Sequence, residues 1–492
     1  MTPEELRTWS PDLQPMILQA LIELGFDQPT EIQALSLPTT LQGKSTLILA
    51  ETGTGKTLSF LLPAITKLKM LEKMTGKRSQ PCRPRVLIIV PTRELGEQVL
   101  SVAKKLCHHI KFVVEGFFGG VGTLSKQRKH LEAGCDIVIG TPMRLNRLAE
   151  KRMLMFGDVR AVAIDEADTM FTQGFEADLD KIIRAVNNAS QKAADTYRQV
   201  MSLRLSSEDD AAKLQRSTPF SMGDDGMLQY ILCAATIRHD AEKIVTKKLP
   251  NLKVVKTNLL HHIPSGIIQK FVEVKPSQQR DVLLDQVRFC LSKVQRESGA
   301  KASVVIFCNT RAGCSFVHEQ LKEQGIPHAS IHGDISEEER FLQMQLFVDG
   351  HLHILVCTDI AARGMDIPQI KAVINFDMPS SSIDYIHRIG RTGRAGGQGY
   401  AVSLVRPENK ILAQRIDEAV RKKRSLERVT AAKESFAPIE KKVVSGRMTG
   451  GQKPSDSLRA KSKSGFKLKP SRHMWFEKGP DGKTRATPRW NA

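Results

Sequence analysis

The chain has 492 residues, of which 41% are hydrophobic and 26% charged, and this ordinary globular composition excludes a wholly disordered or fibrous protein. No apolar run approaches the roughly 18 residues that a membrane span needs, so we expect no membrane segment. The formal net charge is +20, and residues 421–492 alone hold 20 basic and 6 acidic residues. This basic tail predicts a polyanionic partner such as RNA, the alternative being a solvated segment that only maintains solubility.

The eight cysteines include no Cys-x-x-Cys pair, and several lie inside apolar runs. Such spacing is typical of reduced core thiols, so we expect a reducing intracellular compartment and no metal cluster. The first residues resemble neither a secretory signal nor a transit peptide. Mitochondrion, nucleolus and nucleus therefore stay open as locations, and we expect a monomer.

Short runs rich in Val and Ile alternate with longer amphipathic stretches along most of the chain. These runs are 46–49, 86–90, 136–139, 159–164, 231–233, 303–307, 354–356, 372–375 and 399–404. Buried parallel strands have this pattern when helices cover both faces of a sheet, so we predict an α/β fold of two tandem units.

Composition divides the chain further. We expect the first unit at 1–250 with a polar insertion or mobile loop at about 188–225, a linker at 251–266, the second unit at 267–428, and a disordered basic tail at 429–492.

A phosphate-binding loop follows the first apolar run. Its residues are Ala50, Glu51, Thr52, Gly53, Thr54, Gly55, Lys56 and Thr57. Glycines let backbone N–H groups turn toward phosphate oxygens, and the helix that follows presents its positive end to the same anion. We therefore expect Lys56 to contact the β- and γ-phosphates and Thr57 to hold Mg²⁺.

An acidic segment, Asp165-Glu166-Ala167-Asp168, closes the run at 159–164. At the carboxyl end of a buried strand, Asp165 is placed to bind Mg²⁺ through water, and Glu166 to orient or deprotonate the attacking water. An acidic surface turn or helix cap is the simpler interpretation, but the apolar strand before it argues against that.

Together these motifs resemble the DEAD-box RNA helicase family of superfamily 2, over about residues 9–405. The matching segments are 25–26, 29–33, 50–57, 91–95, 119–120, 141–144, 165–168, 234–236, 306–310, 358–359, 362–366 and 387–394. The resemblance implies two RecA-like domains that close on ATP and RNA together.

For ATP, the resemblance implies an adenine site at Thr30 and Gln33, with Phe26 and Trp9 near the base. Asp366 would contact the ribose, and Arg391 and Arg394 would act as arginine fingers. The alternative for the two arginines is a solvated basic turn, because glycines surround them.

For RNA, the resemblance implies contacts to the sugar–phosphate backbone. The implied residues are Thr92, Arg93, Gly120, Thr141, Arg144, Thr310, Arg311, Arg340 and Thr358. Contacts of this kind position a strand without reading its bases, so we expect weak sequence specificity.

Hydrolysis and strand separation would be coupled through Asp168, Thr236 and His387. Two residues depart from the family pattern here. Ala234 replaces the first serine of Ser-Ala-Thr and removes a hydroxyl that would bond Asp168, and Glu337 replaces the glutamine of Gln-x-x-Arg. Ala234 and Glu337 therefore keep open an ATP-gated RNA clamp or assembly scaffold with little unwinding. An unrelated P-loop enzyme such as a nucleotide kinase is a third alternative, but it does not explain the arginine motif at 387–394 or the basic tail.

The stretch 416–426 is similar to organellar family members linked to assembly of the large ribosomal subunit. We therefore expect structured ribosomal RNA as the substrate and ribosome-assembly proteins as partners.

Deletion of residues 430–492 tests the basic tail. We expect weaker RNA binding with a flatter dependence on salt, because a protein that makes fewer cation–phosphate contacts releases fewer counterions when it binds. Basal ATPase activity should be nearly unchanged. Equal salt slopes for the full and the shortened chain would show that the tail has another purpose.

Overall fold

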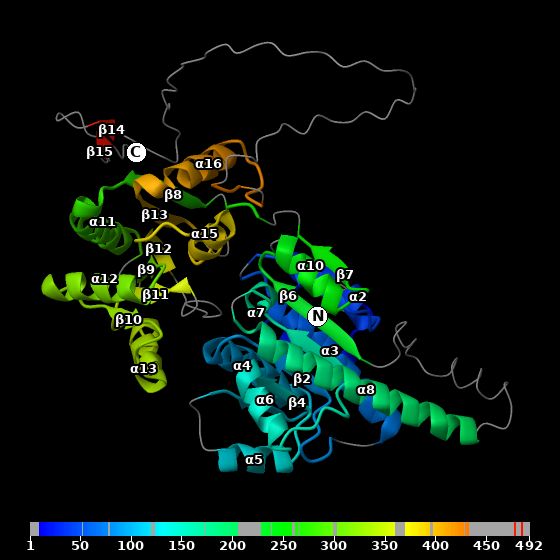
Figure 1. Cartoon of the computed structure of the whole chain (residues 1–492). Coiled ribbons are helices and arrows are strands. Elements are labelled where there is room, and N and C mark those ends of the chain that lie inside the picture. The colour runs from blue at the N-terminus through cyan, green and yellow to red at the C-terminus, as the bar shows by residue number, and fades with distance from the viewer. Residues whose placement is uncertain are drawn as a thin grey trace, which may run out of the picture.

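A computed structural model describes most of both predicted units. The described residues are 9–51, 53–76, 79–119, 124–172, 174–204, 228–237, 239–257, 261–264, 266–298, 303–359, 370–393, 397–427, 429–431, 477–478 and 484–485. The prediction of two tandem α/β units is confirmed: the described chain forms two parallel sheets, each with helices on both faces (Figure 1).

The first sheet has seven strands in the order β3-β4-β2-β5-β6-β1-β7, and every neighbouring pair is parallel. The strands are β1 Thr46–Leu49, β2 Val86–Ile89, β3 Val114–Phe117, β4 Ile137–Gly140, β5 Ala161–Ile164, β6 Gln229–Ala234 and β7 Lys253–Lys256.

Alternate residues of the central strands enter two separate apolar clusters, one on each face of this sheet. On β1, Ile48 lies in one cluster, and Leu47 and Leu49 lie in the other. Helices α1 to α4 cover the first face, and α5 to α8 with α10 cover the second. Their bounds are α1 Pro15–Glu23, α2 Glu31–Leu41, α3 Lys56–Thr75, α4 Arg93–His109, α5 Leu124–Glu132, α6 Pro142–Glu150, α7 Ala167–Met170, α8 Glu176–Arg204 and α10 His239–Lys248. Burial on both faces explains why these strands are continuously apolar in the sequence.

The second sheet has six strands in the order β10-β11-β9-β12-β13-β8, again parallel throughout. The strands are β8 Ile267–Glu273, β9 Ser303–Cys308, β10 Ala329–Ile331, β11 Ile354–Thr358, β12 Ile370–Asn375 and β13 Gly399–Val405. Helices α11 and α12 pack on one face, and α13, α15 and α16 pack on the other. Their bounds are α11 Gln279–Ser298, α12 Arg311–Glu323, α13 Glu337–Val348, α15 Ser382–Ile389 and α16 Lys410–Arg421.

Two predicted segments differ from the structure. We expected an insertion or loop from residue 188, but α8 continues as helix through Arg204, since the stretch contains neither Gly nor Pro to end it. Residues 205–225 of that prediction lie outside the described residues. We placed residues 253–256 in a linker, but they form the edge strand β7 beside β1, because two valines between lysines suit a half-exposed edge.

Beyond the second unit, the described residues of the predicted tail are 429–431 and a short antiparallel pair, β14 Glu477–Lys478 with β15 Thr484–Arg485. All eight cysteines carry free thiols, and six of them are buried. Among the described residues, no helix combines the length and the apolar character that crossing a membrane requires.

Candidate active site

The strand order brings the predicted ATP motifs together at one edge of the first sheet. Strands β5, β6 and β1 are neighbours, and the acidic segment at 165–168, Ala234 and the phosphate-binding loop lie at their carboxyl ends. Parallel strands place all their carboxyl ends on one edge, where open α/β sheets bind ligands. Residues far apart in the sequence therefore share one site.

The phosphate-binding loop wraps around its own lysine. Lys56 Nζ donates to the carbonyl oxygens of Ala50 and Glu51, both at 2.7 Å. Gly55 has a φ of +86°, and a Cβ there would lie 2.5 Å from Gln33 Nε2, so only glycine fits. Burial lowers the pKa of Lys56, while the negative charge of Asp165 opposes that shift. Thr52 lies outside the described residues.

Thr30 and Gln33, predicted to read adenine, are bound to this loop. Thr30 Oγ1 donates to the Thr54 carbonyl at 2.7 Å, and Gln33 Nε2 donates to the Gly55 carbonyl at 2.9 Å. Gln33 Oε1 accepts from the Thr30 backbone N–H at 2.8 Å, which caps the start of α2. Thr30 and Gln33, which are predicted to bind adenine, thus also hold the loop that would bind the phosphates.

The two aromatic side chains expected near the base are placed differently. Phe26 is 37% exposed and available to a ligand, whereas Trp9 is 3% exposed inside the apolar cluster beneath the first sheet. The expectation that Trp9 packs near the base is therefore wrong, because the indole packs in the core.

The acidic segment has features that suit a metal-assisted hydrolysis site. Asp165 is buried and accepts a hydrogen bond from the Glu166 backbone N–H at 2.9 Å. Burial, with the adjacent Glu166 charge, raises the pKa of Asp165 to about 6 against the opposing effect of Lys56. Glu166 has a left-handed φ of +47°, and its Oε2 is buried without a hydrogen-bond partner among the described residues.

These features fit Mg²⁺, which Thr57 and Asp165 would hold, Asp165 through water. A buried carboxylate with a raised pKa gains from a nearby cation, and a backbone held in a rare conformation is typical of functional sites.

One histidine of the second unit reaches the acidic segment of the first. His387 Nε2 lies 2.9 Å from Thr236 Oγ1 and 3.7 Å from Asp168 Oδ2. The three residues predicted to couple hydrolysis to strand separation are thus brought together. Ala234 is fully buried at the end of β6, in the cluster that also contains Ala167.

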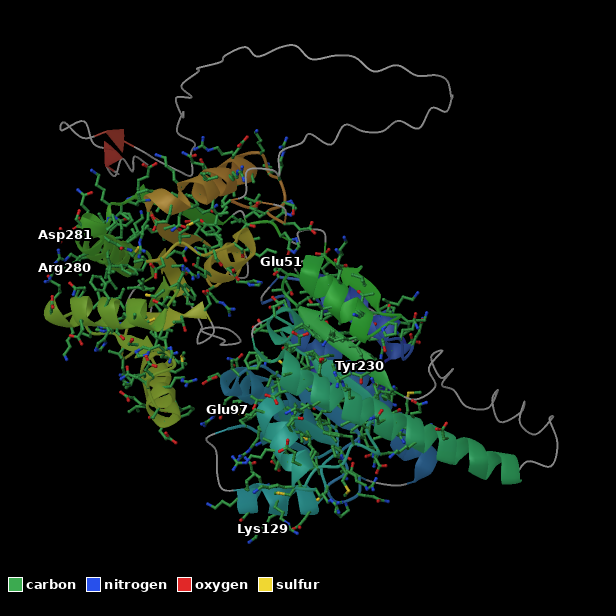
Figure 2. The ribbon with its side chains drawn as sticks, in the orientation of Figure 1. Glu51, Glu97, Lys129, Tyr230, Arg280 and Asp281 are labelled. Atoms are coloured by element: carbon green, nitrogen blue, oxygen red, sulfur yellow. The ribbon has the colours of Figure 1, made fainter. Side chains whose placement is uncertain are left out.

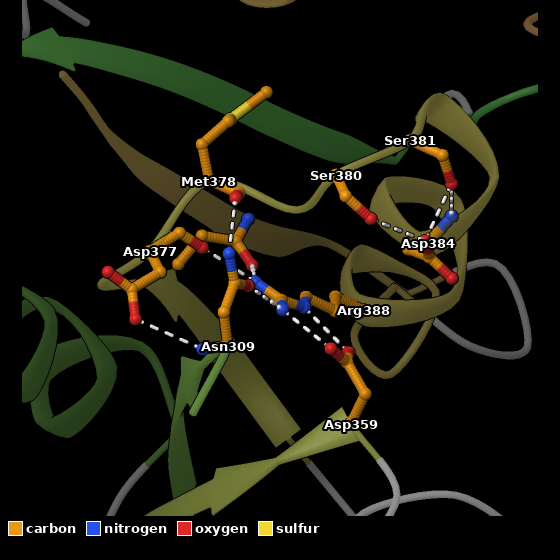
Figure 3. Close-up of polar contacts among 9 residues, drawn as sticks. Asn309, Asp359, Asp377, Met378, Ser380, Ser381, Asp384 and Arg388 are labelled. Carbon is orange, nitrogen blue, oxygen red and sulfur yellow. Dashed lines mark hydrogen bonds and ion pairs between the residues drawn. The ribbon is translucent and has the colours of Figure 1, made fainter. Parts of the chain in front are cut away.

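Beside His387, Arg388 organises the second unit's side of the site (Figure 3). Its guanidinium is 1% exposed and binds both oxygens of Asp359, at 2.7 and 2.6 Å. It also donates to Asn309 Oδ1 at 2.6 Å and to the Asp377 carbonyl at 2.7 Å. The carboxyl ends of β9, β11 and β12 are thereby tied to α15, which carries His387.

The finger arginines are described only in part. Arg391 lies in the turn after α15, where its side chain is buried and near enough to Cys357 to oppose the burial that raises the pKa of that thiol. Arg394 and Asp366 lie outside the described residues. The solvated basic turn is excluded for Arg391, because its side chain is buried.

The threonines predicted to bind RNA lie at the carboxyl ends of strands in both sheets. Thr92 follows β2 and Thr141 follows β4, and each begins a helix whose N-terminus lies at the carboxyl-end edge of the first sheet. In the second unit, Thr310 begins α12 after β9, and its hydroxyl accepts from the Gly313 N–H at 3.0 Å. Helix N-termini favour phosphate groups, which suits a backbone-binding surface.

Side chains of the predicted RNA set already have protein partners in several cases. Arg144 donates to Gln127 at 2.9 Å, and Arg311 pairs with the exposed Asp334 at 2.5 Å. Arg340 Nε is buried without a described hydrogen-bond partner, and Thr358 ends β11. Gly120 and the side chain of Glu337 lie outside the described residues.

One contact of the loop involves a residue outside the predicted site. Thr257, just after β7, donates from its hydroxyl to Glu51 Oε2 at 3.1 Å, and its backbone N–H bonds the Leu49 carbonyl. Glu51 lies where the first unit faces the second (Figure 2). The chain leading to the second unit is therefore attached to the phosphate-binding loop, a pairing over 206 positions that no local motif reveals.

Comparison with known proteins agrees with this geometry. Residues 30–244 match the DEAD/DEAH box helicase family, and residues 282–396 match the helicase conserved C-terminal domain. The chain is 34% identical over 421 residues to DEAD-box ATP-dependent RNA helicase 39 of Arabidopsis thaliana, covering 85% of this chain and 62% of that protein. It is 31% identical over 419 residues to the probable ATP-dependent RNA helicase DDX23 of Homo sapiens, covering 85% of this chain and 48% of that one.

A solved structure of Mss116p bound to ssRNA and AMP-PNP is also similar, with a TM-score of 0.67, 25% identity, and coverage of 83% of this chain and 76% of that one. The chain belongs to the DEAD-box helicase family of superfamily 2, and its two units are RecA-like domains. It spans less than two thirds of the length of either curated relative.

Substitution Arg388→Ala tests the buried network. Removing one partner of a buried ion pair leaves an uncompensated charge, so we expect a loss of about 3–5 kcal/mol in the free energy of unfolding in urea. The matched control is Arg280→Ala, which breaks an exposed pair with Glu323 on the outer side of the second domain (Figure 2) and should cost less than about 1 kcal/mol. Equal losses for the two variants would contradict this role for Arg388.

Substitution Ala234→Ser tests the missing hydroxyl with two measurements. If the serine bonds Asp168, more duplexes should open per ATP without higher basal ATPase, and stability should be retained. If it finds no partner, the buried hydroxyl should cost about 1–3 kcal/mol in the free energy of unfolding. An unchanged ratio of displacement to hydrolysis would refute the coupling interpretation.

Proposed function

We propose that this protein is an ATP-dependent RNA helicase that locally unwinds or remodels RNA. The observation that carries the proposal is the meeting of three motifs on neighbouring strands, with His387 of the second domain bonded to Thr236 beside Asp168. A nucleotide kinase would require neither that second-domain contact nor the basic tail.

In this proposal the chain supplies phosphate binding, water activation and charge stabilisation from separate elements. Lys56 leaves its two carbonyl partners to bind the β- and γ-phosphates, and Glu166 orients the attacking water with its otherwise unpartnered oxygen. Mg²⁺, when bound, neutralises developing negative charge on the phosphates. Thr30 and Gln33 support selection of ATP, because the amide has both donor and acceptor groups.

Closure of the domains would gate hydrolysis. Arg391 belongs to the second domain, so its positive charge reaches the γ-phosphate only when the domains close around ATP and RNA. The threonines at the starts of α4, α6 and α12 would hold the RNA backbone along the same surface. A strand held there in a bent form cannot stay paired, and hydrolysis would release it.

A second function, an ATP-gated RNA clamp with little unwinding, is favoured by one observation. Ala234 offers no hydroxyl to Asp168, so this branch of the coupling network is absent. Slow ATP turnover with RNA retention and little strand displacement would support the clamp.

The class of RNA is a separate proposal. The stretch 416–426 favours ribosomal RNA in ribosome assembly, but Ile416, Asp417 and Ala419 are buried as α16 packs on the second sheet, which also explains part of the pattern. Several curated relatives are named as pre-mRNA-splicing helicases, so pre-mRNA is the competing class. Crosslinking the protein to RNA in cells and sequencing the fragments separates the two classes.

Substitution Arg391→Ala tests the composite site. An arginine finger stabilises charge in the transition state, and we expect RNA-stimulated kcat to fall about 10³-fold while ATP still binds. The matched control is Arg288→Ala, whose exposed side chain donates to Gln324 on the outer helix pair and should leave kcat unchanged. Because Arg391 is buried, circular dichroism should first confirm that the variant folds. RNA-stimulated turnover equal to the unsubstituted protein would refute the proposed mechanism.

A further inference from the structure

An aromatic side chain of the second domain lies against an arginine of the first. Phe341 on α13 is 47% exposed, and the guanidinium carbon of Arg93 lies 5.3 Å from the centre of its ring. Arg93 begins α4 at the edge that carries the predicted RNA-binding residues. Figure 1 shows α13 projecting from the second domain on the side where α4 lies.

This contact leaves one edge of the guanidinium for a phosphate. Arg93 Nε donates to Glu97 Oε1 at 2.7 Å, and the guanidinium carbon lies over the phenyl ring. The hydrogen bond to Glu97 uses Nε and leaves the two terminal nitrogens, which form the edge that binds phosphate oxygens in pairs. The side chain of Arg93 is still 22% exposed, so a ligand can reach it.

We propose that Phe341 is a positioning residue for RNA: it orients Arg93 toward a backbone phosphate of a single strand, and it does so only while the two domains are together. The inference rests on the proposed function. Arg340, beside Phe341, places a second cation at this junction, and its buried Nε has no described hydrogen-bond partner. Cationic side chains combined with an aromatic ring are typical of single-strand surfaces.

The contact would make RNA binding depend on closure. An arginine that is already oriented loses less conformational entropy when it binds, so the phosphate is held more tightly in the closed protein. In the open protein, Arg93 retains Glu97 but loses the ring. Nucleotide that favours closure would thereby raise the affinity for RNA through a residue outside the ATP site.

The test measures the affinity of the full chain for a single-stranded RNA, with a non-hydrolysable ATP analogue and without nucleotide. Phe341→Leu keeps an apolar side chain but removes the ring. We expect RNA affinity to fall about two- to fivefold with the analogue, the effect of an exposed cation–π contact, and to be unchanged without nucleotide. Phe341→Tyr should restore the affinity. The matched control is Leu342→Ala, a neighbour on α13 that is 54% exposed and should have no effect.

A double-mutant cycle separates positioning from domain packing. In an Arg93→Ala background, Phe341→Leu should cause no further loss of RNA affinity, and Arg93→Ala alone should lower the salt slope by about 0.7. Additive losses, or an equal loss without nucleotide, would overturn the inference while leaving the helicase function intact. If the unsubstituted protein binds no RNA with the analogue, the proposed function and this inference both fail.

Discussion

The constraint on which this structure depends is the parallel arrangement of both sheets. Parallel strands place every following loop, and the positive N-terminus of every following helix, at a single edge, and such an edge attracts phosphate groups. In the first sheet, the order β3-β4-β2-β5-β6-β1-β7 divides this carboxyl-end edge into two halves. The ATP motifs lie at the ends of β5, β6 and β1, while Thr92 and Thr141, which are predicted to bind RNA, follow β2 and β4. Both ligands of this family are polyanions, and strand order keeps their sites adjacent but separate.

Contacts between the two domains link the ATP motifs of the first domain to the second domain. His387 reaches Thr236 and Asp168 from a helix that Arg388 holds against the ends of three strands. The buried ion pair of Arg388 with Asp359 is costly to desolvate. Its contribution is to fix the orientation of α15, because a guanidinium that binds both carboxylate oxygens allows few orientations. Thr257, at the start of the connection between the domains, is bonded to Glu51 in the phosphate-binding loop. If phosphate binding moves that loop, the hydrogen bond to Thr257 would therefore also move the start of the chain that joins the domains.

The central strands of both sheets were predictable from the sequence, whereas the edge strands were not. Each central strand is buried on both faces and is a continuous apolar run, and all nine predicted runs became strands. The four strands of these two sheets that were missed, β3, β7, β8 and β10, are the edge strands. Edge strands are half exposed and carry polar residues such as Glu115 and Lys253, so no apolar run marks them. In the site, the loop and the acidic segment were predictable because their residue types are fixed by chemistry. The partners of Arg388 and Glu51 were not, because they lie from 11 to 206 positions away and only the fold brings them together.

The presence of Ala234 in place of the family's serine affects how hydrolysis can be coupled to strand separation. In the family pattern a serine hydroxyl would reach Asp168 from the end of β6, and in this chain the fully buried methyl of Ala234 occupies that position. Asp168 still lies 3.7 Å from His387, which in turn lies 2.9 Å from Thr236. The contacts of His387 run through the second domain, whereas the missing bond would have lain wholly within the first. Loss of the hydroxyl thus removes one bond within the first domain, while His387 still joins Asp168 to Thr236. A link carried by the second domain exists only while the domains are together, which suits the proposed clamp that retains RNA between hydrolysis events.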